Sequence, residues 1–312
     1  MKHLTIDPSA SIAPTRDLPS GKKLPESLPE AKETKLHPSN AGGENASLLF
    51  VGTATTILEW EGIRLMTDPN MKTKSFRSTN SDHFDAQVEA SLRRDLPIIT
   101  TPHAKEHLAT SKEPGEAFKA VHDLDFFDDI LVDIQNSGKG GKKPAIKVTG
   151  MPGKHVPPGP GGVMGKMNDL LAAVPPTNGW MMELGYHAEG SSDDFQCGYR
   201  IYISGDTLLV PELQEIPKRY PHVDLMLVHL GGTTIPSPSV PLLMVTMDAE
   251  QGLKLVQMIG PDLTIPIHYD DYDVFLSPLS DFKKAMDEAG LGDKVVYLDR
   301  KDSYRFKVKD EA

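Results

Sequence analysis

The stretch LLFVGTATTILEWEGIRLMTDP, residues 48–69, decides the fold of this 312-residue chain. It holds two apolar runs separated by a threonine-rich segment, followed by a turn at Glu61-Gly62 and a third apolar run at 63–66. Short apolar and β-branched runs bounded by turn residues are typical of strands. The stretch therefore predicts a meander of strands closed by a hairpin, which ends at Asp68-Pro69.

The C-terminal third alternates strands and helices. Residues 249–259 carry apolar side chains at helical spacing and stop at Gly260-Pro261, and residues 279–289 repeat the pattern before Gly290. The expected strands around these helices are residues 225–228, 263–267 and 295–298. The early part of the chain has several strands in succession, and the later part alternates strands with helices. This order fits an α/β architecture of two sheets with helices outside them.

The N-terminal 45 residues differ in composition from the rest. Prolines recur there among Ser, Lys and Glu, with few large apolar side chains. Such a stretch buries too little surface to offset its ordering entropy. We therefore expect a disordered Pro-rich tail over residues 1–45 and one folded domain over residues 46–312.

Composition and charge exclude several classes of protein. The single cysteine, Cys197, excludes an intramolecular disulfide and a Cys-rich zinc framework. No apolar run approaches the roughly 18 residues of a membrane helix, and the N-terminus lacks the apolar core of a secretory signal, so a cytoplasmic protein is expected. The net charge of −11 at pH 7 repels polyanions and disfavours a nucleic-acid partner.

Five polar side chains stand at strand ends or directly after apolar runs, where loops carry function. They are Asp82, His83, His155, Asp206 and His268. Imidazole nitrogens and carboxylate oxygens suit zinc, manganese or iron. Each residue alone has a structural explanation, such as turn chemistry for the aspartate of Gly-Asp-Thr. The set in this order favours a metal site with positions open for water.

The order of these elements resembles the metallo-β-lactamase superfamily, in particular the branch of ascorbate-phosphate lactonase and N-acyl-phosphatidylethanolamine phospholipase D. The opening stretch 48–69 is similar to the family's first hairpin, and DHFD at 82–85 matches the end of its H-x-H-x-D-H motif. His155 matches the isolated third histidine, Asp206 in IYISGDT the bridging aspartate, and His268 the last histidine. The resemblance covers residues 46 to about 300.

This resemblance implies an αββα sandwich and a metal-dependent hydrolase. Activated water would attack a small-molecule lactam, lactone, ester or phosphodiester. The resemblance assigns one complete metal site to Asp82, His83, Asp206 and His268, with His155 on the side of the other. Asp82 would also be catalytic, by orienting the water. The metal would be zinc, with manganese and iron as alternatives, and one or two ions would bind.

The sequence departs from the family at one place. Ser78 and Asn80 stand where the family's motif begins with two histidines, and the segment near 70–80 is shorter by one strand and a loop. A degenerate or truncated homologue without catalysis, acting as a binding or structural protein, is therefore the alternative function. Retention of all four ligands of the other site opposes this alternative.

Three further features have weaker interpretations. His229 and Tyr269 are candidate substrate contacts, although a structural histidine and a partly buried tyrosine are equally good interpretations. Residues 103–107, HAKEH, fit the H-x-x-E-H pattern of inverted zinc proteases. Pro102 and Pro114 confine that helix, whereas the protease needs a long one, so the protease interpretation is disfavoured. The substrate and the oligomeric state stay open.

Overall fold

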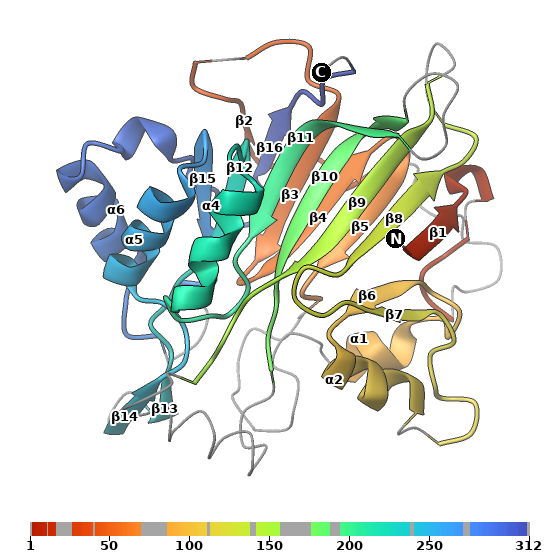
Figure 1. The fold of residues 1–312 in the computed structure, drawn as a ribbon, viewed down its shortest axis with the longest axis horizontal. Helices are drawn as coiled ribbons and strands as arrows, with labels where there is room; N and C mark the ends of the chain where they lie inside the picture. Colours follow the sequence, from red (N-terminus) through yellow and green to blue (C-terminus); the bar gives the residue numbers. More distant parts are fainter. Residues whose placement is uncertain are drawn as a thin grey trace.

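A computed structural model describes residues 2–10, 12–16, 27–39, 41–69, 86–110, 113–137, 142–156, 176–187, 194–237, 240–270 and 275–310. Two β-sheets pack face to face, with helices on the outer face of the larger one (Figure 1). Two facing sheets with helices outside them are the architecture that the sequence predicted. Of the helices in these ranges, none is long and apolar enough to cross a membrane.

The larger sheet has seven strands in the order β1-β8-β9-β10-β11-β12-β15. Their bounds are β1 (Lys2–Ile6), β8 (Asp129–Ile134), β9 (Pro144–Met151), β10 (Gly179–His187), β11 (Phe195–Ile203), β12 (Leu225–His229) and β15 (Leu263–Ile267). β11, β12 and β15 run parallel to one another. Parallel strands place their carboxyl ends at the same edge of the sheet.

The smaller sheet has five strands in the order β2-β16-β3-β4-β5. Their bounds are β2 (Thr34–Lys35), β16 (Ser303–Phe306), β3 (Ala46–Gly52), β4 (Thr55–Trp60) and β5 (Ile63–Thr67). β3, β4 and β5 are the antiparallel meander expected from residues 48–69. Two small pairs complete the strands: β6 (Ile98–Thr100) with β7 (Val121–Asp123), and β13 (Thr234–Ser237) with β14 (Val240–Met244).

The described helices fall into two groups (Figure 1). α4 (Glu215–Arg219), α5 (Ala249–Ile259) and α6 (Leu279–Glu288) lie on the β11-β12-β15 side of the seven-stranded sheet, whereas α1 (Ala86–Ser91) and α2 (Pro102–Lys105) belong to a small unit with β6 and β7. The helices expected at 249–259 and 279–289 are therefore confirmed. The strand expected at 295–298 is wrong, because only Val295 pairs there, through a single bridge to Thr264.

Alternation along the strands divides the core into two layers, because successive strand residues point to opposite faces. Leu225 and Leu227 of β12 point into the core between the two sheets. Met226 and Val228 of the same strand point to the core beneath the helices. The position after Val228 in this alternation, His229, therefore belongs to the face between the sheets.

The N-terminal segment differs from the disordered tail that we expected. β1 pairs in parallel with β8 at the edge of the seven-stranded sheet, and Leu4 and Ile6 pack against the core between the sheets. β2 pairs in parallel with β16 of the other sheet. The expectation is wrong for these two segments, since sheet edges offer unpaired backbone groups that a short strand satisfies. The shortened segment near 70–80 lies outside the described residues.

Candidate metal centre

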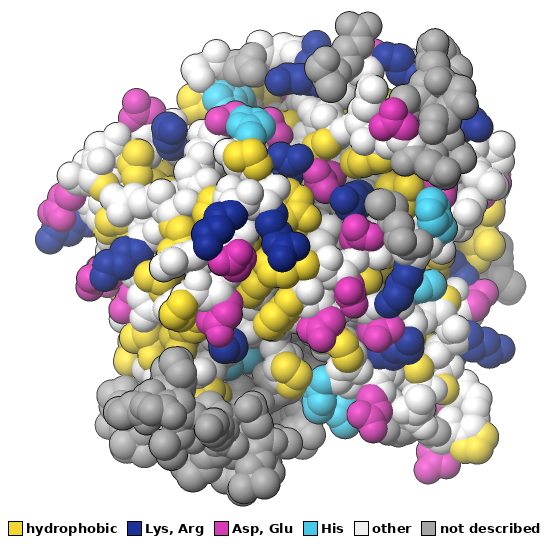
Figure 2. All heavy atoms as spheres, in the orientation of Figure 1, with side chains coloured by type: hydrophobic (Ala, Val, Ile, Leu, Met, Phe, Trp, Pro, Cys, Tyr) yellow, Lys and Arg dark blue, Asp and Glu magenta, His cyan; other side chains and the backbone are white. Residues whose placement is uncertain are grey.

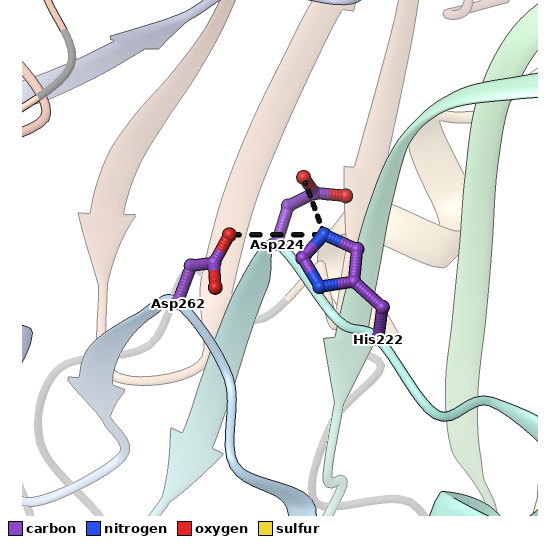
Figure 3. Close-up of side chains that lie close together, drawn as sticks. All are labelled: His222, Asp224 and Asp262. Carbon is purple, nitrogen blue, oxygen red and sulfur yellow. Dashed lines mark hydrogen bonds and ion pairs between the residues drawn. The ribbon is translucent and has the colours of Figure 1, made fainter. Parts of the chain in front are cut away.

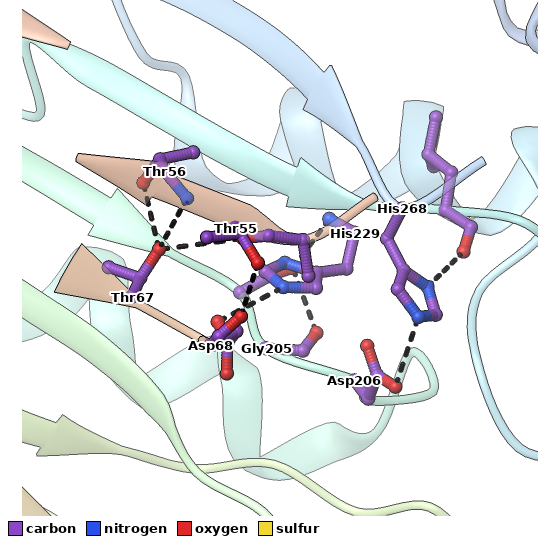
Figure 4. A network of polar contacts seen from close by, with 11 residues as sticks. Thr55, Thr56, Thr67, Asp68, Gly205, Asp206, His229 and His268 are labelled. Carbon is purple, nitrogen blue, oxygen red and sulfur yellow. Dashed lines mark hydrogen bonds and ion pairs between the residues drawn. The ribbon is translucent and has the colours of Figure 1, made fainter. Parts of the chain in front are cut away.

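The candidate centre lies at the carboxyl ends of three parallel strands of the larger sheet (Figure 4). Asp206 follows β11, His229 is the last residue of β12, and His268 follows β15. Residues far apart in the sequence meet here because the strands share one direction. This edge is where open α/β sheets place ligands.

Asp206 and His268 form the best-defined part of the centre. Both side chains are buried, and Nε2 of His268 lies 3.5 Å from Oδ2 of Asp206. Nδ1 of His268 lies 3.1 Å from the backbone carbonyl oxygen of Leu230. A carbonyl oxygen can only accept a hydrogen bond, so Nδ1 carries the proton of the neutral ring. Nε2 then presents its lone pair on the side of the Asp206 carboxylate.

This arrangement fits a metal ion. Ligand atoms at about 2.0–2.1 Å from a tetrahedral zinc lie about 3.4 Å from one another, close to the 3.5 Å between Nε2 and Oδ2. Metal-binding histidines commonly donate their second ring nitrogen to a carbonyl or carboxylate, which sets the tautomer. Leu230 supplies such a carbonyl to His268.

The backbone around both residues takes left-handed conformations. Gly205, directly before Asp206, has a φ of +64°, and His268 has a φ of +60°. For a non-glycine residue this conformation costs about 1–2 kcal/mol. The backbone N–H of His268 donates a 2.6 Å hydrogen bond to the carbonyl of Thr53, in the turn between β3 and β4. The smaller sheet thus holds His268 in the conformation that turns its ring toward Asp206.

His155 follows β9, and its Nδ1 contacts a backbone carbonyl oxygen as Nδ1 of His268 does. Its Nδ1 lies 3.1 Å from the carbonyl oxygen of Val245, so the neutral ring again carries its proton on Nδ1. The preceding residue, Lys154, donates its backbone N–H to Oγ1 of Thr207 over 2.8 Å and accepts from the backbone of Leu208 over 2.9 Å. The structure therefore ties the His155 segment to the turn that carries Asp206.

The other predicted ligands, Asp82 and His83, lie outside the described residues, as do Ser78 and Asn80. The described chain reaches Pro69 and resumes at Ala86. The assignments to these residues therefore stay predictions.

The two predicted substrate contacts lie in different environments. The side chain of His229 has no exposed surface, and its Nε2 is 3.8 Å from Oδ2 of Asp68. This position agrees with the structural interpretation of His229, and its contact with substrate stays a prediction. Tyr269 is half-buried and donates its hydroxyl to the carbonyl of Leu298 over 3.2 Å. Its contact with substrate stays a prediction.

A second group of possible ligands was missed by the sequence analysis. Among the described residues, His222, Asp224 and Asp262 bring ligand atoms within 4.8 Å of one another (Figure 3). They precede β12 and β15, at the opposite ends of the strands from His229 and His268. His222 and Asp262 are exposed, and Oδ2 of Asp224 accepts the backbone N–H of Arg200 over 2.7 Å. This group is spatially separate from the candidate centre.

Comparisons with known proteins bear on the family and the fold. A family model described as a beta-lactamase superfamily domain matches residues 78–269. A metal-dependent hydrolase of Methanopyrus kandleri is 22% identical over 263 residues, which cover 82% of this chain and 98% of the relative. A metal-dependent hydrolase of Ignicoccus hospitalis is 26% identical over 250 residues, covering 78% and 91% of the two chains.

Solved structures show the same fold. An isothiocyanate hydrolase from Delia radicum gut bacteria superposes with a TM-score of 0.61 at 16% identity, covering 83% of this chain and 99% of its own. A possible metal-dependent hydrolase from Veillonella parvula gives 0.59 at 16% identity, covering 82% and 98%. At these identities the likeness concerns the fold.

Proposed function

Because this chain belongs to the beta-lactamase superfamily, we propose that it is a metal-dependent hydrolase that holds one zinc ion and acts on a small molecule. The observation that carries the proposal is the buried pair of His268 and Asp206, whose ligand atoms lie 3.5 Å apart while Leu230 sets the histidine tautomer. The relatives that cover most of the chain agree with this enzyme class.

The residues of the candidate centre would have different roles in this reaction. Asp206 and His268 would hold the metal, and by the resemblance Asp82 and His83 would complete the set, with His155 beside it. A zinc ion there would supply an activated water by lowering its pKa to about 7. By the resemblance, Asp82 would orient a water for attack on the carbonyl or phosphoryl centre of a lactam, lactone, ester or phosphodiester. Zinc is preferred because the donors are imidazole and carboxylate; manganese and iron accept the same donors.

Charge supports a small, neutral or cationic substrate. The chain carries a net charge of −11 at pH 7. On the face shown in Figure 2, the described Lys and Arg side chains are interspersed with Asp and Glu and form no broad patch of one sign. A polyanion such as nucleic acid needs a basic surface. We therefore infer a small-molecule substrate.

The single cysteine takes no part in this chemistry. Burial raises the pKa of the Cys197 thiol to about 12, so the nucleophilic thiolate is scarce at neutral pH.

The first test is the metal content per chain after purification without chelator, with Asp206→Ala beside the wild type. About one equivalent in the wild type, lost in Asp206→Ala, supports the proposal. His222→Ala is the matched control, because it removes an exposed ligand at the other end of β12 and is expected to keep the metal.

Two results would contradict the proposal. Two equivalents in both the wild type and His222→Ala would show that Ser78 and Asn80, in place of the two histidines, do not weaken the second metal site. If the folded protein binds no metal when it is resupplied with zinc and manganese, the proposal of a metal-dependent enzyme is overturned. The degenerate homologue, which those two substitutions favour, then remains. With metal bound, turnover is screened over lactams, lactones, esters and phosphodiesters. An isothiocyanate is added to the screen because the isothiocyanate hydrolase from Delia radicum gut bacteria shares the fold.

A further inference from the structure

We propose that Asp68, His229 and Ser204 form a clasp between the two sheets that positions Asp206 and His268 for the metal. This inference rests on the proposed function. The clasp is a continuous chain of polar contacts in Figure 4, running from the hairpin of the smaller sheet to the turn that carries Asp206.

His229 is the centre of the clasp. It shares the inward face of β12 with Leu225 and Leu227, which lie in the apolar core between the sheets. A polar ring with no exposed surface at such a position needs polar partners, because an unsatisfied buried group costs about 1–3 kcal/mol. The partners come from both sheets.

Asp68 is the partner on the smaller sheet. It directly follows β5, and its Oδ2 lies 3.8 Å from Nε2 of His229, a separation within reach of an ion pair but too long for a direct hydrogen bond. Its backbone has a φ of +41°, and its carbonyl oxygen accepts the Oγ1 hydroxyl of Thr55 on β4 over 2.5 Å. The hairpin thus holds Asp68 in a conformation that an unconstrained aspartate rarely adopts.

Ser204 is the partner on the larger sheet. Its Oγ accepts the backbone N–H of His229 over 2.9 Å and lies 3.4 Å from Nδ1 of the same residue. The hydroxyl also lies 3.0 Å from the carbonyl oxygen of Gly205, to which it can donate. Gly205 directly precedes Asp206, so a change at His229 reaches the candidate ligand through two residues, Ser204 and Gly205.

The clasp also borders the second ligand. The rings of His229 and His268 have centroids 5.7 Å apart, and the carbonyl that fixes the tautomer of His268 belongs to Leu230, the neighbour of His229. Together with the hydrogen bond from His268 to Thr53, the clasp sets how the smaller sheet sits against the ligand turns. Groups that support metal ligands typically change metal affinity 10–100-fold when they are removed.

The test measures zinc affinity by competition with a chromophoric chelator, together with stoichiometry and the melting temperature of metal-free protein. Asp68→Asn and His229→Gln are each expected to weaken zinc binding 10–100-fold with unchanged stoichiometry. The double variant is expected to have the same zinc affinity as the weaker-binding of the two single variants, because both substitutions act through one contact. Asp68→Glu, which keeps the carboxylate, is expected to bind more tightly than Asp68→Asn.

His187→Gln is the matched control. His187 is also buried, and its Nε2 lies 2.7 Å from Oδ1 of Asp133. It sits at the far end of β10, opposite Phe195 of β11, whereas the candidate centre follows Ile203 at the other end. The control is expected to keep the wild-type zinc affinity.

Three outcomes would overturn the clasp. Unchanged affinity in Asp68→Asn and His229→Gln would show a merely structural contact, even if the metal-free proteins melt earlier. Loss of a full equivalent of zinc in His229→Gln would make His229 a ligand instead. A wild type that binds no metal would overturn the proposed function itself, which distinguishes that failure from failure of the clasp alone.

Discussion

Gly205 shows how strictly one residue constrains the candidate centre. It combines a φ of +64° with a site where an added Cβ would lie 2.4 Å from the carbonyl oxygen of Asn178. The left-handed conformation costs a non-glycine residue about 1–2 kcal/mol, and overpacking typically adds 1–3 kcal/mol. Because the contact is with backbone, side-chain movement cannot relieve it.

We therefore predict that Gly205→Ala destabilises the protein by about 2–5 kcal/mol and weakens metal binding by displacing Asp206. Gly260→Ala is the control, since Gly260 has a φ of +62° with nothing within 4 Å of the added Cβ. It is expected to cost about 1–2 kcal/mol with unchanged metal content. Urea denaturation and metal analysis check both. Equal stability of the two variants would contradict the close contact at Gly205.

At the scale of elements, α5 shows a helix with both ends specified in the sequence. Oδ1 of Asp248 accepts the backbone N–H of Gln251 over 2.9 Å as the N-cap, and Gly260 ends the helix in the left-handed conformation. The side chain of Asp248 satisfies one of the N–H groups that a helix start leaves unpaired. The apolar residues between these ends pack on the seven-stranded sheet.

The contribution of the Asp248 N-cap to the stability of α5 can be measured by substitution. Asp248→Ala is expected to lower the free energy of unfolding by about 1 kcal/mol, since alanine cannot accept the Gln251 N–H. Asp248→Asn keeps an accepting oxygen and is expected to stay near the wild type. Urea denaturation at neutral pH measures both changes. An asparagine variant as unstable as the alanine variant would assign the effect to charge rather than to capping.

At the scale of the whole molecule, the N-terminal segment connects distant parts of the chain. Arg16 forms a two-pronged contact with Glu116, at 2.9 and 2.7 Å, and Arg94 donates to the same carboxylate over 2.5 Å. Contacts with Arg16 and then Arg94 lower the pKa of Glu116 from 4.5 to about 2. The carboxylate therefore stabilises the fold above about pH 4.5, and this contribution is lost as the pH falls toward 2.

We predict that Glu116→Gln lowers the melting temperature at pH 7 and that its difference from the wild type closes between about pH 4.5 and 2. Thermal melts across this range check the prediction. Glu113→Gln removes a negative charge from the same loop and is expected to follow the wild-type curve. A constant offset of Glu116→Gln at every pH would contradict the paired carboxylate.

The sequence by itself determined the hairpin at 48–69, the two long helices near the C-terminus and the candidate ligands Asp206 and His268. The hairpin and the helices rest on local signals, namely apolar periodicity and glycine stops. The two candidate ligands rest on the order of polar residues along the chain and on its resemblance to the family. These patterns lie in the linear sequence, so no long-range contact was needed to interpret them.

Only the tertiary structure decided the pairing of β1, the burial of His229 and the tautomer of His268. The residues KHLTI carry no local sign that the edge of β8 will bind them, and proline-rich surroundings suggested a tail. Asp68 and His229 are 161 positions apart, and they meet because two sheets close over one core. Which ring nitrogen of His268 faces Asp206 depends on the carbonyl of Leu230, 38 residues away, and a contact over that separation exists only once the chain has folded.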